Sequence, residues 1–158
     1  MSHHPRIVIT GLGAVTDLGL TAHQTWAGMR EGRSGISHFE GDEFKKYTGT
    51  WDVTIAGQIK NFDPVAHAGI EGREVKRMDR FCHFALSAAS EAVRHSGIDF
   101  ARVDTERAGV MVGSGVGGIR TIEEGLHVMI DRGQDRLSPF TVPRLMVNAG
   151  TGMISIRY

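Results

Sequence analysis

The chain has 158 residues, of which 41% are hydrophobic and 23% charged, a composition typical of a globular domain with enough apolar residues for one core. The formal net charge is zero, so the sequence indicates neither a nucleic-acid-binding nor an anionic-membrane-binding protein. No apolar run approaches the roughly 20 residues of a membrane span, no signal peptide is recognisable, and the single cysteine excludes an internal disulfide, which together favour a cytoplasmic protein.

The first half of the chain begins with an apolar strand pattern and continues into a helix. Residues 6–10 are apolar and rich in β-branched side chains, which predicts a buried strand. Thr21 is suited to cap the helix that follows it. Residues 33–75 are the least regular stretch, and within it residues 53–56 form a short candidate strand. This order already indicates α/β organisation.

The second half contains the clearest helix, from about Lys76 to His95, which we expect to end at Gly97. Its apolar positions recur every three or four residues, and many are alanines, which predicts the close approach of a neighbouring helix or sheet. Residues 108–112 then predict a second buried strand, followed by a helix over 119–130. A further helix should begin at 142–143, with proline in its first turn.

A glycine-rich loop, Gly113–Gly118, joins the second predicted strand to the next helix and contains the pattern G-x-G-x-x-G. This context is the one that a dinucleotide-binding loop requires, so a nicotinamide-dependent oxidoreductase is one alternative function. However, the acidic residue expected about 20 positions further on, at the end of a strand, is missing. Asp131 and Asp135 fall instead in a polar turn. Close backbone packing that only glycine permits is therefore the favoured interpretation.

Cys82 and the adjacent His83 are the candidates for a nucleophile and its base. Neighbouring residues on a helix point in directions about 100° apart, so we do not expect these two side chains to face each other. Cys82 lies on the apolar stripe of its helix, which predicts a buried structural thiol. The histidines show neither H-E-x-x-H nor a Cys/His cluster, so the sequence predicts no metal site.

Basic residues gather where the main helix begins, at Arg73, Lys76, Arg77 and Arg80. Such a group usually forms a solvated face. The alternative is an electrostatic platform for an acidic partner.

Five short motifs occur in a recognisable order along nearly the whole chain. They are RIVITGLG at 6–13, GRSGI at 32–36, KRMDRF at 76–81, GSGVGG at 113–118 and SPFTVP at 138–143. With these segments the chain resembles the N-terminal part of a β-ketoacyl-acyl-carrier-protein synthase, most closely the type II synthases of dissociated fatty-acid synthesis. Each segment alone would be a weak signal.

The resemblance implies a thiolase-like, layered α/β/α/β/α fold, of which residues 1–158 would form most of the first half, with the C-terminal half absent. Members of this family elongate acyl chains by decarboxylative Claisen condensation of an acyl thioester with malonyl carrier protein. They need no cofactor. Their nucleophilic cysteine and two histidines would lie beyond Tyr158, so no residue of this chain is expected to be catalytic, and the fragment alone should be inactive.

The resemblance also implies an acyl pocket and a dimer. Val116 matches a bulky aliphatic position that gates the acyl pocket. Phe140 and Thr141 match a segment that reaches the pocket of the second subunit in a homodimer. A second aromatic residue is common in the family where this chain has Thr141, so this departure bears on chain-length preference.

By the same resemblance, Arg73, Lys76 and Arg77 match basic positions that bind acyl carrier protein bearing acyl or malonyl phosphopantetheine. No metal, nucleic acid or membrane is implied as a partner. One alternative within this reading is a short relative that docks carrier protein without catalysis, and it would require the chain to end at Tyr158.

Overall fold

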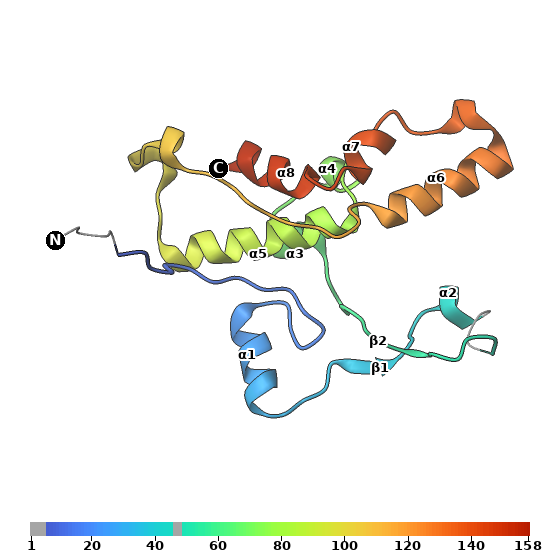
Figure 1. The fold of residues 1–158 in the computed structure, drawn as a ribbon, viewed down its shortest axis with the longest axis horizontal. Helices are drawn as coiled ribbons and strands as arrows, with labels where there is room; N and C mark the ends of the chain where they lie inside the picture. Colours follow the sequence, from blue (N-terminus) through green and yellow to red (C-terminus); the bar gives the residue numbers. More distant parts are fainter. Residues whose placement is uncertain (1–5, 46–48) are drawn as a thin grey trace. The chain divides into compact units, whose positions relative to one another are not determined.

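The computed structural model describes residues 6–45 and 49–158. Contacts within the chain divide it into two compact units, one of which is Gly13–Phe62, while the other joins the residues up to Leu12 to Asp63–Tyr158. In Figure 1 the helices of the larger unit run from green to red. No helix in the described ranges is long and apolar enough to cross a bilayer.

The smaller unit combines two helices with a two-stranded sheet. Its elements are α1 (Ala22–Arg30), β1 (Ile36–His38), α2 (Asp42–Lys45) and β2 (Ile55–Gly57). As predicted, Thr21 caps α1, because its hydroxyl accepts a hydrogen bond from the Gln24 amide at 3.1 Å. The strands pair antiparallel, with Ser37 opposite Ala56. The strand expected at 53–56 is confirmed but shifted toward its C-terminal end, and its partner β1 was not predicted.

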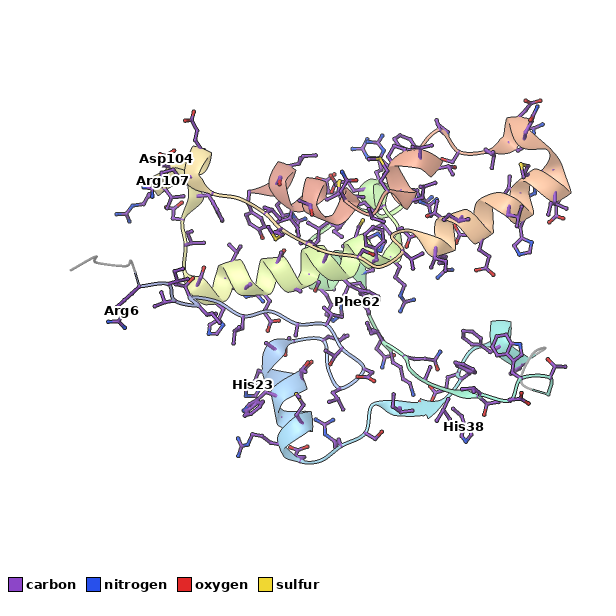
Figure 2. All side chains as sticks on the ribbon, viewed as in Figure 1. Arg6, His23, His38, Phe62, Asp104 and Arg107 are labelled. Carbon is purple, nitrogen blue, oxygen red and sulfur yellow. The ribbon has the colours of Figure 1, made fainter. Side chains whose placement is uncertain are left out.

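The regular elements described in the larger unit are helices, joined by extended and irregular segments. Its helices are α3 (Pro64–Ala68), α4 (Gly72–Val75), α5 (Arg80–Ser96), α6 (Ile119–Arg132), α7 (Thr141–Leu145) and α8 (Ala149–Arg157). Three short 3₁₀ turns, η1 (Phe100–Arg102), η2 (Thr105–Arg107) and η3 (Gln134–Arg136), complete it. Figure 2 shows Asp104 and Arg107 on the turns that follow α5, at the opposite end of α5 from α4.

The core of this unit lies where α5 meets α3 and α8. Its buried apolar residues are Ala68, Ile70, Met78, Cys82, Leu86 and Ile154. The predicted close approach along the alanine-rich helix is confirmed, because a Cβ atom on Gly150 of α8 would lie 3.5 Å from the Ala85 Cβ of α5. Arg157 ties the end of α8 to α3 by donating to the carbonyls of Ala68 and Gly69.

The main helix begins later than predicted and ends where it was expected. Asp79 has an extended backbone and its carboxylate accepts from the Phe81 amide at 3.5 Å, so α5 begins at Arg80 rather than near Lys76. At the other end, Gly97 takes the left-handed conformation with φ 66°. The helix expected over 119–130 is also confirmed as α6. The last predicted helix is divided into α7 and α8.

The two strands predicted at 6–10 and 108–112 are not strands in this structure. Within the described part of the chain, neither run joins a hydrogen-bond ladder, and Ile7 and Met111 are 94% and 97% exposed. A side chain can replace a ladder hydrogen bond at a single residue. The Thr151 hydroxyl does so by bonding both the amide and the carbonyl of Val112. A strand requires a neighbouring strand, which local sequence does not provide.

Candidate functional site

The N-terminal ends of α5 and α6 meet at the carboxylate of Asp79, which is 4% exposed. One oxygen, Oδ1, caps α5 at the Phe81 amide. The other, Oδ2, accepts from the Thr121 amide at 2.9 Å and from the Thr121 hydroxyl at 2.6 Å. A negative charge at two helix N-termini is favourable, because each terminus presents unpaired amides and a positive dipole end. Asp79 and Thr121 are 42 positions apart in the sequence, and the fold brings them into contact.

The last two glycines of the Gly113–Gly118 loop allow α7 to lie directly against it. The Gly118 amide donates to the Leu145 carbonyl at 3.1 Å. A Cβ atom on Gly118 would lie 2.6 Å from the Arg144 carbonyl oxygen, and Gly117 has φ 75°. The predicted close backbone packing is therefore confirmed at Gly117 and Gly118, where a side chain would displace α7.

Asp79 also bears on the dinucleotide alternative. In a dinucleotide-binding loop, the ligand's pyrophosphate bonds the amides at the N-terminus of the helix. Here the Thr121 amide at that terminus already bonds a buried carboxylate. A phosphate would have to displace Asp79 or sit beside its charge, so this arrangement argues against a nicotinamide-cofactor site at Gly113–Gly118.

The residues predicted to line an acyl pocket lie on two segments that meet at Gly118. Val116, in the loop before α6, is 57% exposed, and Phe140, just before α7, is 40% exposed. Thr141 begins α7 and is partly buried. It lines a cavity of about 140 Å³ between α6 and the turn before α7, together with Thr121 and Leu137.

The basic residues predicted to bind a carrier protein are all exposed. Arg73 belongs to α4, Lys76 is its C-cap, and Arg77 lies in the turn before α5. The Arg77 guanidinium carbon lies 5.0 Å from the centroid of the Phe140 ring, a cation–π contact. The structure thus places one edge of the basic group beside the predicted acyl-pocket segment, an adjacency that the sequence did not reveal.

Cys82 and His83 are buried and chemically separate, as predicted. Burial, followed by the nearby Asp79 charge, raises the pKa of the Cys82 thiol to about 11. Burial lowers the pKa of His83, whose Nε2 donates to the Val75 carbonyl at 3.2 Å. An ionised thiol is disfavoured at this position, which argues against Cys82 as a nucleophile and favours a structural role.

Potential metal ligands do not gather in the described ranges, where no group of three or more His, Cys, Asp or Glu side chains could hold an ion. Figure 2 shows His23 on α1 and His38 on β1, each on its own element of the smaller unit. His38 contacts the Thr54 hydroxyl at 3.2 Å through Nδ1.

Sequence reasoning did not identify Asp79 and Thr121 as a pair. The one local signal was an aspartate immediately before the main helix, a preferred N-cap residue. Its second role, at the N-terminus of α6, depends on tertiary structure.

Comparison with solved structures identifies the fold class of the chain. The AntDE:AntF complex, a type II PKS acyl-carrier protein in complex with its ketosynthase, contains a chain that superimposes with a TM-score of 0.76 at 21% identity. The match covers 98% of this chain and 39% of that one. The chain therefore has the fold of the first part of a ketosynthase, the thiolase-like α/β fold.

The family follows from sequence. The family model "Beta-ketoacyl synthase, N-terminal domain" matches residues 4–158. Two proteins named 3-oxoacyl-(acyl-carrier-protein) synthase 2 are similar: one from Staphylococcus aureus is 38% identical over 99% of the chain, and one from Synechocystis is 35% identical over 96%. The chain spans 36% and 35% of their respective lengths. It belongs to the β-ketoacyl synthase family.

Proposed function

We propose that this chain is the N-terminal portion of a β-ketoacyl-acyl-carrier-protein synthase that elongates acyl chains in fatty-acid biosynthesis. The observation that carries this proposal is the family match over residues 4–158, together with relatives that are named as such synthases. The reaction joins an enzyme-bound acyl thioester to a malonyl thioester with loss of carbon dioxide. The thiolate nucleophile and the two histidines that assist decarboxylation would be supplied by the remaining part of the enzyme.

Within that enzyme, residues 1–158 would form most of the first thiolase-like half. Val116, Phe140 and Thr141 would line the acyl pocket. The partly exposed side chains of Val116 and Phe140 and the meeting of their segments at Gly118 support this assignment. A homodimer and a cytoplasmic location stay predictions of the family resemblance.

The direct test is condensation by the full-length protein. Purified enzyme would be incubated with acyl and malonyl carrier proteins, and β-ketoacyl product and carbon dioxide would be measured by mass spectrometry. We expect both in equal amounts, without added nicotinamide cofactor, and no product from residues 1–158 alone. Carrier binding without condensation by the full-length protein would instead favour the docking-module alternative. Nicotinamide-dependent turnover would favour the oxidoreductase.

The carrier protein would dock on Arg73, Lys76 and Arg77. These side chains are exposed, and a structurally similar ketosynthase has been solved in complex with an acyl-carrier protein. Complementary charge chiefly increases the association rate and fixes the register of two partners. Attraction between exposed charges is also weakened by salt.

Charge reversal tests this docking surface. We expect Arg73→Glu, Lys76→Glu and Arg77→Glu each to weaken carrier-protein binding about three- to tenfold at low salt, which corresponds to about 0.7–1.4 kcal/mol. Calorimetry or surface plasmon resonance on the full-length enzyme would measure the change, and added salt should reduce it. Arg107→Glu, an exposed change on η2, is the matched control. Affinities that match this control in all three variants would contradict the proposed surface.

A further inference from the structure

Asp79 lies at the point where the elements that carry the proposed acyl pocket converge. Its Oδ2 bonds the first turn of α6, and a Cβ atom on Gly118 would lie 3.0 Å from the same oxygen. Gly118 is two residues beyond Val116. It is also bonded to Leu145, the last residue of the helix that Phe140 precedes. One buried carboxylate thus bonds the first turn of α6 and lies close to Gly118, the loop residue that is hydrogen-bonded to α7.

The hydrogen bonds between Asp79 and Thr121 fix the position of the first turn of α6. Both residues are buried, at 4% and 2% exposure. The hydroxyl-to-carboxylate distance of 2.6 Å is that of a charge-assisted hydrogen bond, which is stronger than a bond between neutral groups. Loss of the carboxylate would leave the Thr121 amide and hydroxyl buried without this acceptor, so the first turn of α6 would have to rearrange.

The two ends of the loop are held by other elements, while its middle is not: Thr151 of α8 bonds the backbone of Val112, just before the loop, and Gly118 bonds Leu145 after it. The Ser114 hydroxyl accepts from the Gly117 amide at 2.9 Å, a bond inside the loop. Cβ atoms on Gly113 and Gly115 would meet nothing within 4 Å, so the backbone there is in open space. Of the two anchors, the C-terminal one at Gly118 lies two residues from Val116 and the N-terminal one at Val112 lies four, so Gly118 and Thr121 are the nearer constraint on its position.

We infer that Asp79 and Thr121 form a positioning pair that sets the location of Val116 and thereby the acyl-chain-length selectivity of the enzyme. The inference rests on the proposed synthase function and adds to it a specificity determinant beyond Val116, Phe140 and Thr141. The pair is assigned a positioning role and not a catalytic one, because both residues are buried and their side chains bond each other. With the pair broken, Val116 would occupy a range of positions, and discrimination between long and short acyl chains would fall.

The test uses near-isosteric variants of the full-length enzyme, Asp79→Asn and Thr121→Val. For each, kcat/KM would be measured with a short and a long acyl-carrier substrate, and the ratio of the two values would be compared with that of the wild type. We expect either change to reduce this discrimination about fivefold. The effects of the two changes should be less than additive in the double variant, because both act on the bond between the Thr121 hydroxyl and the Asp79 carboxylate. Thr121→Ser keeps the hydroxyl and should restore the wild-type ratio.

A matched control separates positioning from simple loss of stability. Asp63 caps α3 by accepting from the Val65 amide at 2.9 Å, and it takes no part in the loop. Asp63→Ala, which removes the capping oxygen, should lower the melting temperature without changing the substrate ratio. If Asp79→Asn and Thr121→Val lowered the melting temperature but left the ratio at the wild-type value, the inference would be overturned. Should Asp79→Asn fail to fold, Thr121→Val alone decides. A wild-type enzyme without condensation activity would overturn the proposed function instead.

Discussion

At the scale of single residues, Cys82 shows how strongly burial decides the chemistry of a side chain. The thiol is fully buried, and one helical turn away Asp79 places a carboxylate at the start of the same helix. Both effects disfavour a thiolate, whereas catalytic cysteines occupy positive, partly exposed surroundings. The adjacent His83 offers no compensation, because its Nε2 is engaged with the Val75 carbonyl.

The raised pKa and the burial of the Cys82 thiol predict that it is alkylated slowly in the folded protein. A pKa of about 11 in place of the ordinary 9.0 reduces the thiolate fraction near neutral pH about 100-fold. Burial should slow the reaction further. We therefore expect iodoacetamide at pH 7.5 to label the peptide containing Cys82 at least about 100-fold more slowly in the folded enzyme than in urea. Peptide mass spectrometry would give both rates. Equal rates would show that the thiol is accessible and would reopen a reactive role.

At the scale of helices and strands, features specified by local sequence were predicted well. Thr21 and Gly97 mark helix ends through bonds within a few residues of themselves. The start of α5 was placed too early, because the apolar pattern includes Met78, which is buried before the helix begins. Residues 6–10 and 108–112 have strand-like composition, yet a strand exists only with a partner, and composition does not supply one.

The packing of α6 against α7 gives a test at this scale. Gly118→Ala would place a methyl group 2.6 Å from the Arg144 carbonyl oxygen, so α7 would have to move. We expect a loss of about 1–3 kcal/mol in the free energy of unfolding, measured by urea titration. Gly125→Ala in the middle of α6 is the control, because its nearest new contact is 3.7 Å away. Alanine is the better helix former, so that change should stabilise by up to about 1 kcal/mol. The same sign for both variants would contradict the packing argument.

For the molecule as a whole, the sequence predicted which residues would form the acyl pocket and the docking surface but not how they are arranged. Family motifs singled out the basic residues and the acyl-pocket positions, and the structure shows that Arg73, Lys76 and Arg77 are exposed. The contact between Arg77 and Phe140 and the bond between Asp79 and Thr121 each join segments far apart in the chain. Such pairings depend on how helices pack, which no local pattern encodes.

The apolar segments 6–10 and 108–112 leave hydrophobic side chains exposed on the larger unit. Ile9 and Met111 are 82% and 97% exposed. A groove of about 800 Å³ lies between α5, α8 and residues 108–112 and is lined by Val110 and Tyr158, among others. Unpaired backbone beside exposed apolar side chains is a template for strand addition or aggregation.

If this chain is part of a longer synthase, as proposed, that surface becomes the inner face of a larger sheet. Amides in residues 6–10 and 108–112 should then exchange hydrogen at least about tenfold more slowly in the full-length enzyme than in residues 1–158 alone, because ladder hydrogen bonds protect them. Exchange measured by mass spectrometry would compare the two proteins, with α5, helical in this structure, as the internal reference. Protection of α5 in both proteins would show that the shorter one is folded. Equal, fast exchange of the two apolar segments in both proteins would mean that they are not strands of a sheet at all, and the thiolase-like layering proposed for the whole enzyme would then lack its central strands.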